Sequence, residues 1–197
     1  MLTVVFDAAP LITACKFAAH GTLVIDHLLA GCCIMITPSI EEEVAVLGAS
    51  YPDGEVAGER IAQGRIQVVP VAEQRWARHL AAYALGDGER DTIELCGQTA
   101  GIEALVTDDY LAFVAAIRQG LKAWMLPDLV LELAARGALA IEVAESVLTA
   151  MHSRYRVGVI EHSRVRLQEI KQHAESCGAC EGGNSAGCGA SQGSGRE

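Results

Sequence analysis

The chain has few aromatic residues and no long apolar run. Phe, Trp and Tyr make up 5% of its 197 residues. No stretch approaches the roughly 18–20 apolar residues that a membrane-spanning helix needs. Its start, Met1-Leu2-Thr3, leads directly into a strand-like segment and lacks the basic region that opens a secretory signal peptide. We therefore expect a cytoplasmic protein with no membrane partner.

Positive charge is also scarce. Lys and Arg number 15 against 25 Asp and Glu, which gives a formal net charge of −10. This balance argues against general electrostatic attraction to nucleic acid or to an anionic membrane. It is still compatible with a nucleic-acid substrate, because bound divalent cations would reverse the local field.

The cysteines show no disulfide or zinc pattern. Four of the seven (Cys15, Cys32, Cys33 and Cys96) lie in apolar segments, as small buried side chains in a reducing compartment do. The others, Cys177, Cys180 and Cys188, lack the fourth ligand of a structural zinc site, so a metal site there is the less favoured alternative. Residues 177–197 are rich in Gly, Ser and Ala, and this composition predicts a disordered tail.

Half of the chain is hydrophobic, at 51%, and strand-like segments alternate with helical ones. This alternation predicts an α/β fold with a parallel sheet and helices on both faces. We expect an α/β domain over residues 1–126, a helical extension over 127–176 and the tail over 177–197. The apolar segments typical of strands are residues 3–6, 33–36, 66–69, 104–106 and 122–125. The helical segments of the domain are residues 8–19, 23–30, 56–63, 73–84 and 111–119, with one more that starts at residues 37–44 and another after Gly88.

The segment 86–109 organises the candidate site. Gly86 and Gly88 end the preceding helix, and the acidic residues Asp87, Glu89 and Asp91 fall near the start of the next one. A short apolar strand then ends on Thr107-Asp108-Asp109. Ligands of open α/β sheets bind outside the carboxyl ends of the strands. This segment therefore predicts a site for a hard cation.

Two further carboxylates occupy similar positions. Asp7 directly follows the first strand, where it is either a helix N-cap or a site residue. Glu43 lies one turn inside a helix that follows the second strand, where it either complements the helix dipole or turns toward the strand ends. Converging carboxylates repel unless a cation lies among them, and ligand sets made only of oxygen favour Mg²⁺ or Mn²⁺. The natural chemistry of such a site is phosphodiester hydrolysis.

Four motifs, in this order, carry a resemblance to a known family. They are V-V-F-D-A-A-P-L-I-T-A-C-K, I-T-P-S-I-E-E-E-V, G-E-R-D-T-I-E-L-C and A-L-V-T-D-D. Together they resemble a PIN domain, and their order is closest to the VapC-like group that carries a GExE-type third motif. The resemblance covers about residues 3–126, and the helices to about 172 are a plausible extension of the same family.

The resemblance implies a set of site residues. Asp7 would be the first acidic ligand and Glu43 the second, and Asp91 would be the third, where the group usually has glutamate. Asp108 or Asp109 would complete the set. The implied catalytic residues are Asp7, Glu43, Asp91 and Asp108, and the implied metal ligands are Asp7, Asp91, Asp108 and Asp109.

The resemblance also implies an activity and partners. Such proteins are Mg²⁺- or Mn²⁺-dependent endoribonucleases that cleave RNA. They are often toxins neutralised by a small antitoxin protein that covers the acidic site. A homodimer is the expected assembly.

Two other functions have to be weighed. A catalytically inactive PIN fold that serves as a binding or regulatory module is favoured modestly by the net acidity of the chain. A phosphoryl-transfer receiver domain also clusters aspartates around Mg²⁺, but it needs a lysine at the end of a late strand. Lys122 instead begins the last predicted strand, which disfavours that alternative.

The basic residues of the chain gather in its C-terminal helices. They form either a solvated helix face, which is the more common case, or a surface that contacts phosphate or a partner. They are Arg154, Arg156, Arg164, Arg166 and Lys171.

Overall fold

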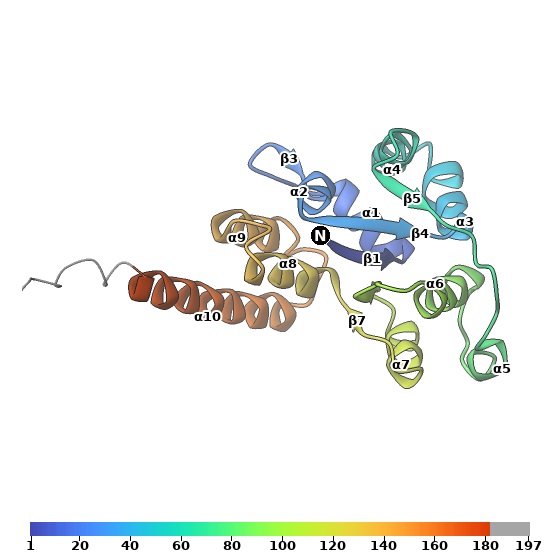
Figure 1. The fold of residues 1–197 in the computed structure, drawn as a ribbon. Coiled ribbons are helices and arrows are strands. Elements are labelled where there is room, and N and C mark those ends of the chain that lie inside the picture. Colours follow the sequence, from blue (N-terminus) through green and yellow to red (C-terminus); the bar gives the residue numbers. More distant parts are fainter. Residues whose placement is uncertain (182–197) are drawn as a thin grey trace, which may run out of the picture.

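The computed structural model describes residues 1–181 of the chain, with side chains to residue 176. Its centre is a five-stranded parallel sheet in the order β5-β4-β1-β6-β7 (Figure 1). The strands are β1 (Leu2–Phe6), β4 (Cys32–Ile36), β5 (Ile66–Val68), β6 (Ala104–Val106) and β7 (Ala123–Trp124). A small antiparallel hairpin, β2 (Ala18–Ala19) and β3 (Thr22–Leu23), lies apart from this sheet.

Helices connect the strands and continue beyond the last one. Those within the sheet region are α1 (Ala8–Lys16), α2 (Val24–Gly31), α3 (Pro38–Glu41), the π-helix η1 (Glu42–Leu47), α4 (Pro52–Ala62), α5 (Ala77–Leu80), α6 (Asp87–Gln98) and α7 (Tyr110–Arg118). The chain then forms α8 (Leu126–Ala135), α9 (Ile141–Ala150) and α10 (Val157–Glu181). Within residues 1–181, no helix combines the length and the apolar character required to cross a bilayer.

Successive side chains of the strands point to opposite faces of the sheet, and both faces are covered. Val4 and Phe6 of β1 belong to a large apolar cluster formed with α1, α2 and the C-terminal helices. Val5 of β1 and Leu105 of β6 belong to a second cluster, which includes residues of α6 and α7. This arrangement confirms the predicted parallel α/β sheet with helices on both faces.

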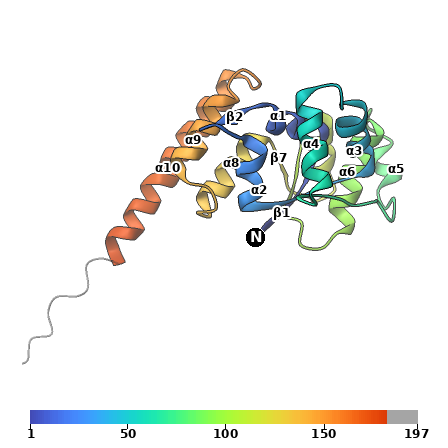
Figure 2. The ribbon, with the colours of Figure 1, turned by 90° about the horizontal axis from the view of Figure 1, so that it is seen from above.

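The C-terminal helices share the main core of the sheet. Leu133 of α8, Val147 of α9 and Leu167 of α10 are buried in the same cluster as Val4. The C-terminal part of α10 projects away from the body of the molecule in both views (Figures 1 and 2). The helix runs to Glu181, beyond the predicted start of the tail at residue 177. The rest of that predicted disordered tail, residues 182–197, lies outside the described residues.

One predicted helix is much shorter than expected. The helical segment at 73–84 is reduced to α5, because the chain before it is held against α6 by side chains. The Gln98 side-chain carbonyl accepts hydrogen bonds from the amides of Ala72 and Glu73, and Glu94 Oε1 accepts one from the amide of Trp76. These tertiary hydrogen bonds outweigh the local preference for helix.

Candidate functional site

Asp7 lies at the carboxyl end of β1 and is 5% exposed. Its Oδ1 accepts a hydrogen bond from the amide of Ala8 at 2.8 Å, so it is the N-cap of α1. Its Oδ2 accepts a second bond from the hydroxyl of Thr107 at 2.7 Å. Burial raises the pKa of Asp7, although both hydrogen bonds act to lower it, and the charge of Asp109 raises it further. Asp7 is thus both a helix cap and a buried carboxylate at the strand edge.

The two aspartates after β6 have different surroundings. Asp109 is the N-cap of α7, where its Oδ1 accepts a bond from the amide of Ala112 at 2.8 Å. Asp108 instead accepts hydrogen bonds from the hydroxyl of Tyr155, at 3.1 Å to Oδ1 and 2.9 Å to Oδ2. Burial raises the pKa of Asp108, while the bond from Tyr155 and the charge of Arg154 oppose that rise.

Glu89 and Glu43 approach these aspartates from other elements. Glu89 lies in the first turn of α6, and its Oε2 accepts a bond from the amide of Gly86 at 2.7 Å. Burial raises the pKa of Glu89, and the negative charges of Asp109, Asp7 and Glu43 raise it further. Glu43 is exposed on η1. Its Oε2 atom lies close to Gly88, 3.8 Å from the position that a Cβ atom would occupy there. The charges of Asp7, Glu43, Glu89 and Asp109 therefore act on one another.

A shared depression brings these residues together at the carboxyl edge of the sheet. Its volume is about 430 Å³. Its acidic lining is Asp7, Glu43, Asp87, Glu89, Asp108 and Asp109. The remaining lining residues are Ala8, Ala9, Gly86, Gly88 and Arg154. Of the acidic residues expected from the sequence, all except Asp91 line this depression.

Asp91 lies in a neighbouring depression, which Asp87 also lines. Its Oδ2 accepts a hydrogen bond from the hydroxyl of Ser39 and so links α6 to α3. In an α-helix, residues two apart point in directions about 200° apart. Glu89 and Asp91 therefore face different sides of α6, and Glu89 is the one that faces Asp7. The sequence places both residues in the first turns of this helix, and the family motif named Asp91 as the third ligand.

The carboxylates of the depression provide the oxygen ligands that a hard cation such as Mg²⁺ prefers. Among the side chains that the structure describes, residues 1–176, no three of His, Cys, Asp or Glu are already grouped closely enough to hold one metal ion. Mg²⁺ keeps several of its waters and is often bound through only one or two carboxylates. The site offers oxygen ligands alone, and burial together with neighbouring negative charges raises the pKa values of Asp7 and Glu89. A divalent cation would relieve that repulsion.

The turn between α9 and α10 supplies two residues whose place in the site the sequence did not reveal. Tyr155 is buried and bonded to Asp108. The Arg154 Nη2 atom lies 3.7 Å from Asp108 Oδ2, and its Nε donates a hydrogen bond to Thr13 Oγ1 at 3.2 Å. No local pattern connects this turn with Asp108, because 47 residues separate Tyr155 from it.

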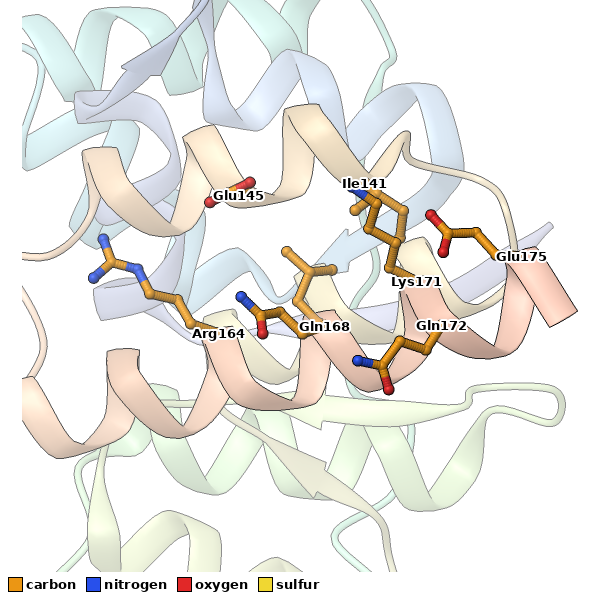
Figure 3. Close-up of a pocket in the computed structure, with 8 residues that line it drawn as sticks. Ile141, Glu145, Arg164, Gln168, Lys171, Gln172 and Glu175 are labelled. Atoms are coloured by element: carbon orange, nitrogen blue, oxygen red, sulfur yellow. The ribbon is translucent and has the colours of Figure 1, made fainter.

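A different depression lies between α9 and α10 (Figure 3). Its lining contains side chains of both charges. Glu145 and Glu175 are acidic, and Arg164 and Lys171 are basic. Arg164 pairs with Glu161, and Arg166 further along α10 pairs with Glu169. This surface lacks the concentration of carboxylates found at the sheet edge, so it is not the candidate site.

Comparisons with known proteins were made for the whole chain. A family model described as a PIN domain matches residues 3–173. None of the curated proteins compared with the chain matches it. Among solved structures, the chain is similar to a domain of a functionally unknown protein from Methanocaldococcus jannaschii DSM 2661. The identity is 17% and the TM-score 0.40, over 64% of this chain and 91% of that one. Structural similarity at this level supports no conclusion about function.

Proposed function

This chain belongs to the PIN-domain family, and from that premise we propose that it is a metal-dependent endoribonuclease that cleaves phosphodiester bonds in RNA. The family assignment gives the chain a nuclease-like fold. The VapC-like subgroup with its GExE-type third motif, and the role of a toxin in a toxin–antitoxin pair, are parts of the proposal. They are supported by the order of the four acidic motifs and by the position of Glu89 in the third of them.

The observation that supports this function best is the burial of neighbouring carboxylates that also repel one another. Burial and neighbouring negative charges raise the pKa values of Asp7 and Glu89 in one depression at the carboxyl edge of the sheet. Groups arranged in this way oppose folding when they are ionised, and pKa values perturbed in a cleft are typical of functional sites. A chain that needed only helix caps here would not require four carboxylates to face one another.

The residues are proposed to have separate roles. Asp7, Asp109 and Glu89 would hold Mg²⁺ or Mn²⁺, with Glu43 at the exposed rim. When bound, such an ion supplies a water of lowered pKa and neutralises charge on the phosphate. Asp108 would anchor Tyr155 beside this set, and Thr107 orients Asp7. The family motif favours Asp91 as the third ligand, whereas its bond to Ser39 supports a role in fixing α6 against α3.

The proposed partners have two different grounds. RNA is proposed as the substrate from the family assignment, and the acidic depression suits a small antitoxin that inserts a basic side chain into it. A homodimer and a cytoplasmic location complete the proposal.

The test is the cleavage of a labelled single-stranded RNA with Mn²⁺ or Mg²⁺. Asp7→Asn should abolish most of the activity, and so should EDTA. Asp53→Asn on α4 makes the same chemical change outside the depression and should leave the rate unchanged. Activity that persists both in Asp7→Asn and in the presence of EDTA would contradict the metal-dependent mechanism.

A non-catalytic PIN module is the second candidate. The observation that favours it is that the described side chains, those of residues 1–176, contain no ready group of three metal-binding residues. Calorimetry separates the two candidates. In an inactive module the wild-type protein should bind Mn²⁺ no better than Asp7→Asn does, whereas the nuclease proposal requires the variant to bind much more weakly.

A further inference from the structure

Among the residues that the structure describes, Arg154 is the one basic side chain that lines the acidic depression. It belongs to the turn between α9 and α10, more than 40 residues beyond the last of the carboxylates. The other basic residues of the C-terminal helices lie elsewhere. The position of this guanidinium group among carboxylates needs an explanation.

The contacts of Arg154 hold its side chain but leave its outer nitrogens available. Nε donates to Thr13 Oγ1 at 3.2 Å, and the guanidinium carbon lies 5.9 Å from the centre of the Tyr155 ring. Nη2 is 3.7 Å from Asp108 Oδ2, which is longer than a hydrogen bond. Within the described residues neither Nη atom makes a hydrogen bond, and the side chain is 44% exposed.

Neutralising Asp108 is a poor explanation for this arrangement. The hydroxyl of Tyr155, whose one hydrogen is shared between the two oxygens of Asp108, already supplies this buried carboxylate with a donor. A half-exposed ion pair at 3.7 Å contributes little stability. The Arg154 side chain is therefore better explained by a ligand that the depression receives from outside.

We propose that Arg154 binds a phosphate group of the RNA substrate beside the carboxylates. This inference rests on the ribonuclease function proposed above. Carboxylates alone repel a phosphodiester, whereas the planar fork of a guanidinium group matches two phosphate oxygens. The sheet edge then supplies the acidic groups, and the turn between α9 and α10 supplies the group that positions the substrate. The C-terminal helices are thus part of the site.

The test compares Arg154→Gln with Arg156→Gln in the full chain. Arg156 lies in the same turn and loses the same charge, but it does not line the depression. Cleavage of a labelled single-stranded oligoribonucleotide with Mn²⁺ gives kcat and KM. Binding of the same RNA is followed by fluorescence anisotropy at several salt concentrations in the Asp7→Asn background. Thermal unfolding of each variant reports its stability.

Arg154→Gln should raise KM and the dissociation constant about tenfold, with a smaller change in kcat. The slope of log K against log salt should become shallower by about 0.7, the loss of one phosphate contact to a single strand. Arg154→Lys should recover part of the binding. Arg156→Gln should behave like the wild-type protein, and Mn²⁺ binding should be kept in both glutamine variants.

The possible failures are distinguishable. Equal KM, affinity and salt slope in the two glutamine variants of an active enzyme would overturn the role of Arg154 and leave the ribonuclease function standing. A lower melting temperature with unchanged KM and salt slope would show a purely structural role, which also overturns it. RNA binding that depends on Arg154 without any cleavage would support the inference and contradict the nuclease. No binding of RNA by the wild-type protein would overturn both.

Discussion

The hydroxyl group of Thr107 donates a hydrogen bond to Oδ2 of Asp7 over 2.7 Å, and both side chains are buried. Asp7 directly follows β1, and Thr107 directly follows β6. These two strands are paired in parallel, with Phe6 opposite Val106. The bond lowers the pKa of Asp7 against the larger effect of burial. The charge state of the first carboxylate therefore depends on the neighbouring strand.

Thr107→Val should destabilise the protein more at neutral pH than in acid. The lost bond stabilises the ionised form of Asp7, and a buried hydrogen bond to a charged group contributes about 1.5–3 kcal/mol. Denaturant unfolding at pH 7 and below pH 3 measures the difference. Thr92→Val is the control, because Thr92 is buried and bonds to the neutral carbonyl oxygen of Gly88. Equal losses at both pH values for Thr107→Val would contradict this assignment.

The folded protein should lose stability as pH rises through the raised pKa values of Asp7 and Glu89. A raised pKa in the folded state means that the protonated form folds more favourably. The stabilising contribution is therefore complete below the unfolded pKa and is lost above the folded one. Asp7→Asn should remove part of this loss and so raise the metal-free melting temperature at pH 7. A melting temperature lowered equally at all pH values would show that Asp7 acts only as a cap.

Mn²⁺ or Mg²⁺ should stabilise the wild-type protein at neutral pH. At a hundredfold excess over the dissociation constant, the gain is about 2.7 kcal/mol. The gain should shrink toward pH 4, where protons compete for the carboxylates. Thermal unfolding with and without the ion provides the measurement, with Asp53→Asn as a control that keeps the response. A shift of equal size in Asp7→Asn would place the ion elsewhere.

Glu89→Gln and Asp91→Asn distinguish the two candidates for the third carboxylate. Because Glu89 lines the depression with Asp7, its variant should lose most of the Mn²⁺ response. Asp91→Asn should keep that response and lose a little stability, since its hydrogen bond from Ser39 is weakened. Calorimetric titration with Mn²⁺ measures both. The opposite ranking would favour the ligand set that the family motif implies.

Tyr155→Phe should cost about 1.5–3 kcal/mol at pH 7, because the buried carboxylate of Asp108 loses its hydroxyl donor. The pKa of Asp108 should then rise further, so the loss should be smaller in acid than at neutral pH. A double-mutant cycle with Asp108→Asn, followed by denaturant unfolding, isolates the pair. Additive effects of the two substitutions would show that the hydroxyl does not act through Asp108.

The sequence predicted the sheet well because its strands are short apolar runs bounded by polar residues. Residues 104–106 form β6 as expected, and the chain emerges from it on Thr107-Asp108-Asp109. Strand ends also predicted the position of Asp7, because parallel strands share one carboxyl edge. Local patterns of this kind need no knowledge of distant contacts.

The rest of the site depended on tertiary contacts. The choice between Glu89 and Asp91 is a matter of helix rotation, which is set by how α6 packs on the sheet. The different surroundings of Asp108 and Asp109 come from Tyr155, on a turn that follows α9. The shortened helix before α6 likewise reflects Gln98 and Glu94, whose partners lie some 18 to 26 residues earlier in the chain.

The late position of Tyr155 and Arg154 matters while the protein is being made. Ribosomes release a chain from its N-terminus, so β1, β6 and all the carboxylates of the depression emerge before the turn between α9 and α10. A nascent chain that has reached only residue 150 lacks the donor for Asp108 and the guanidinium group beside it. The contacts that Asp108 makes with Tyr155 and Arg154 can therefore form only after the turn between α9 and α10 has been synthesised.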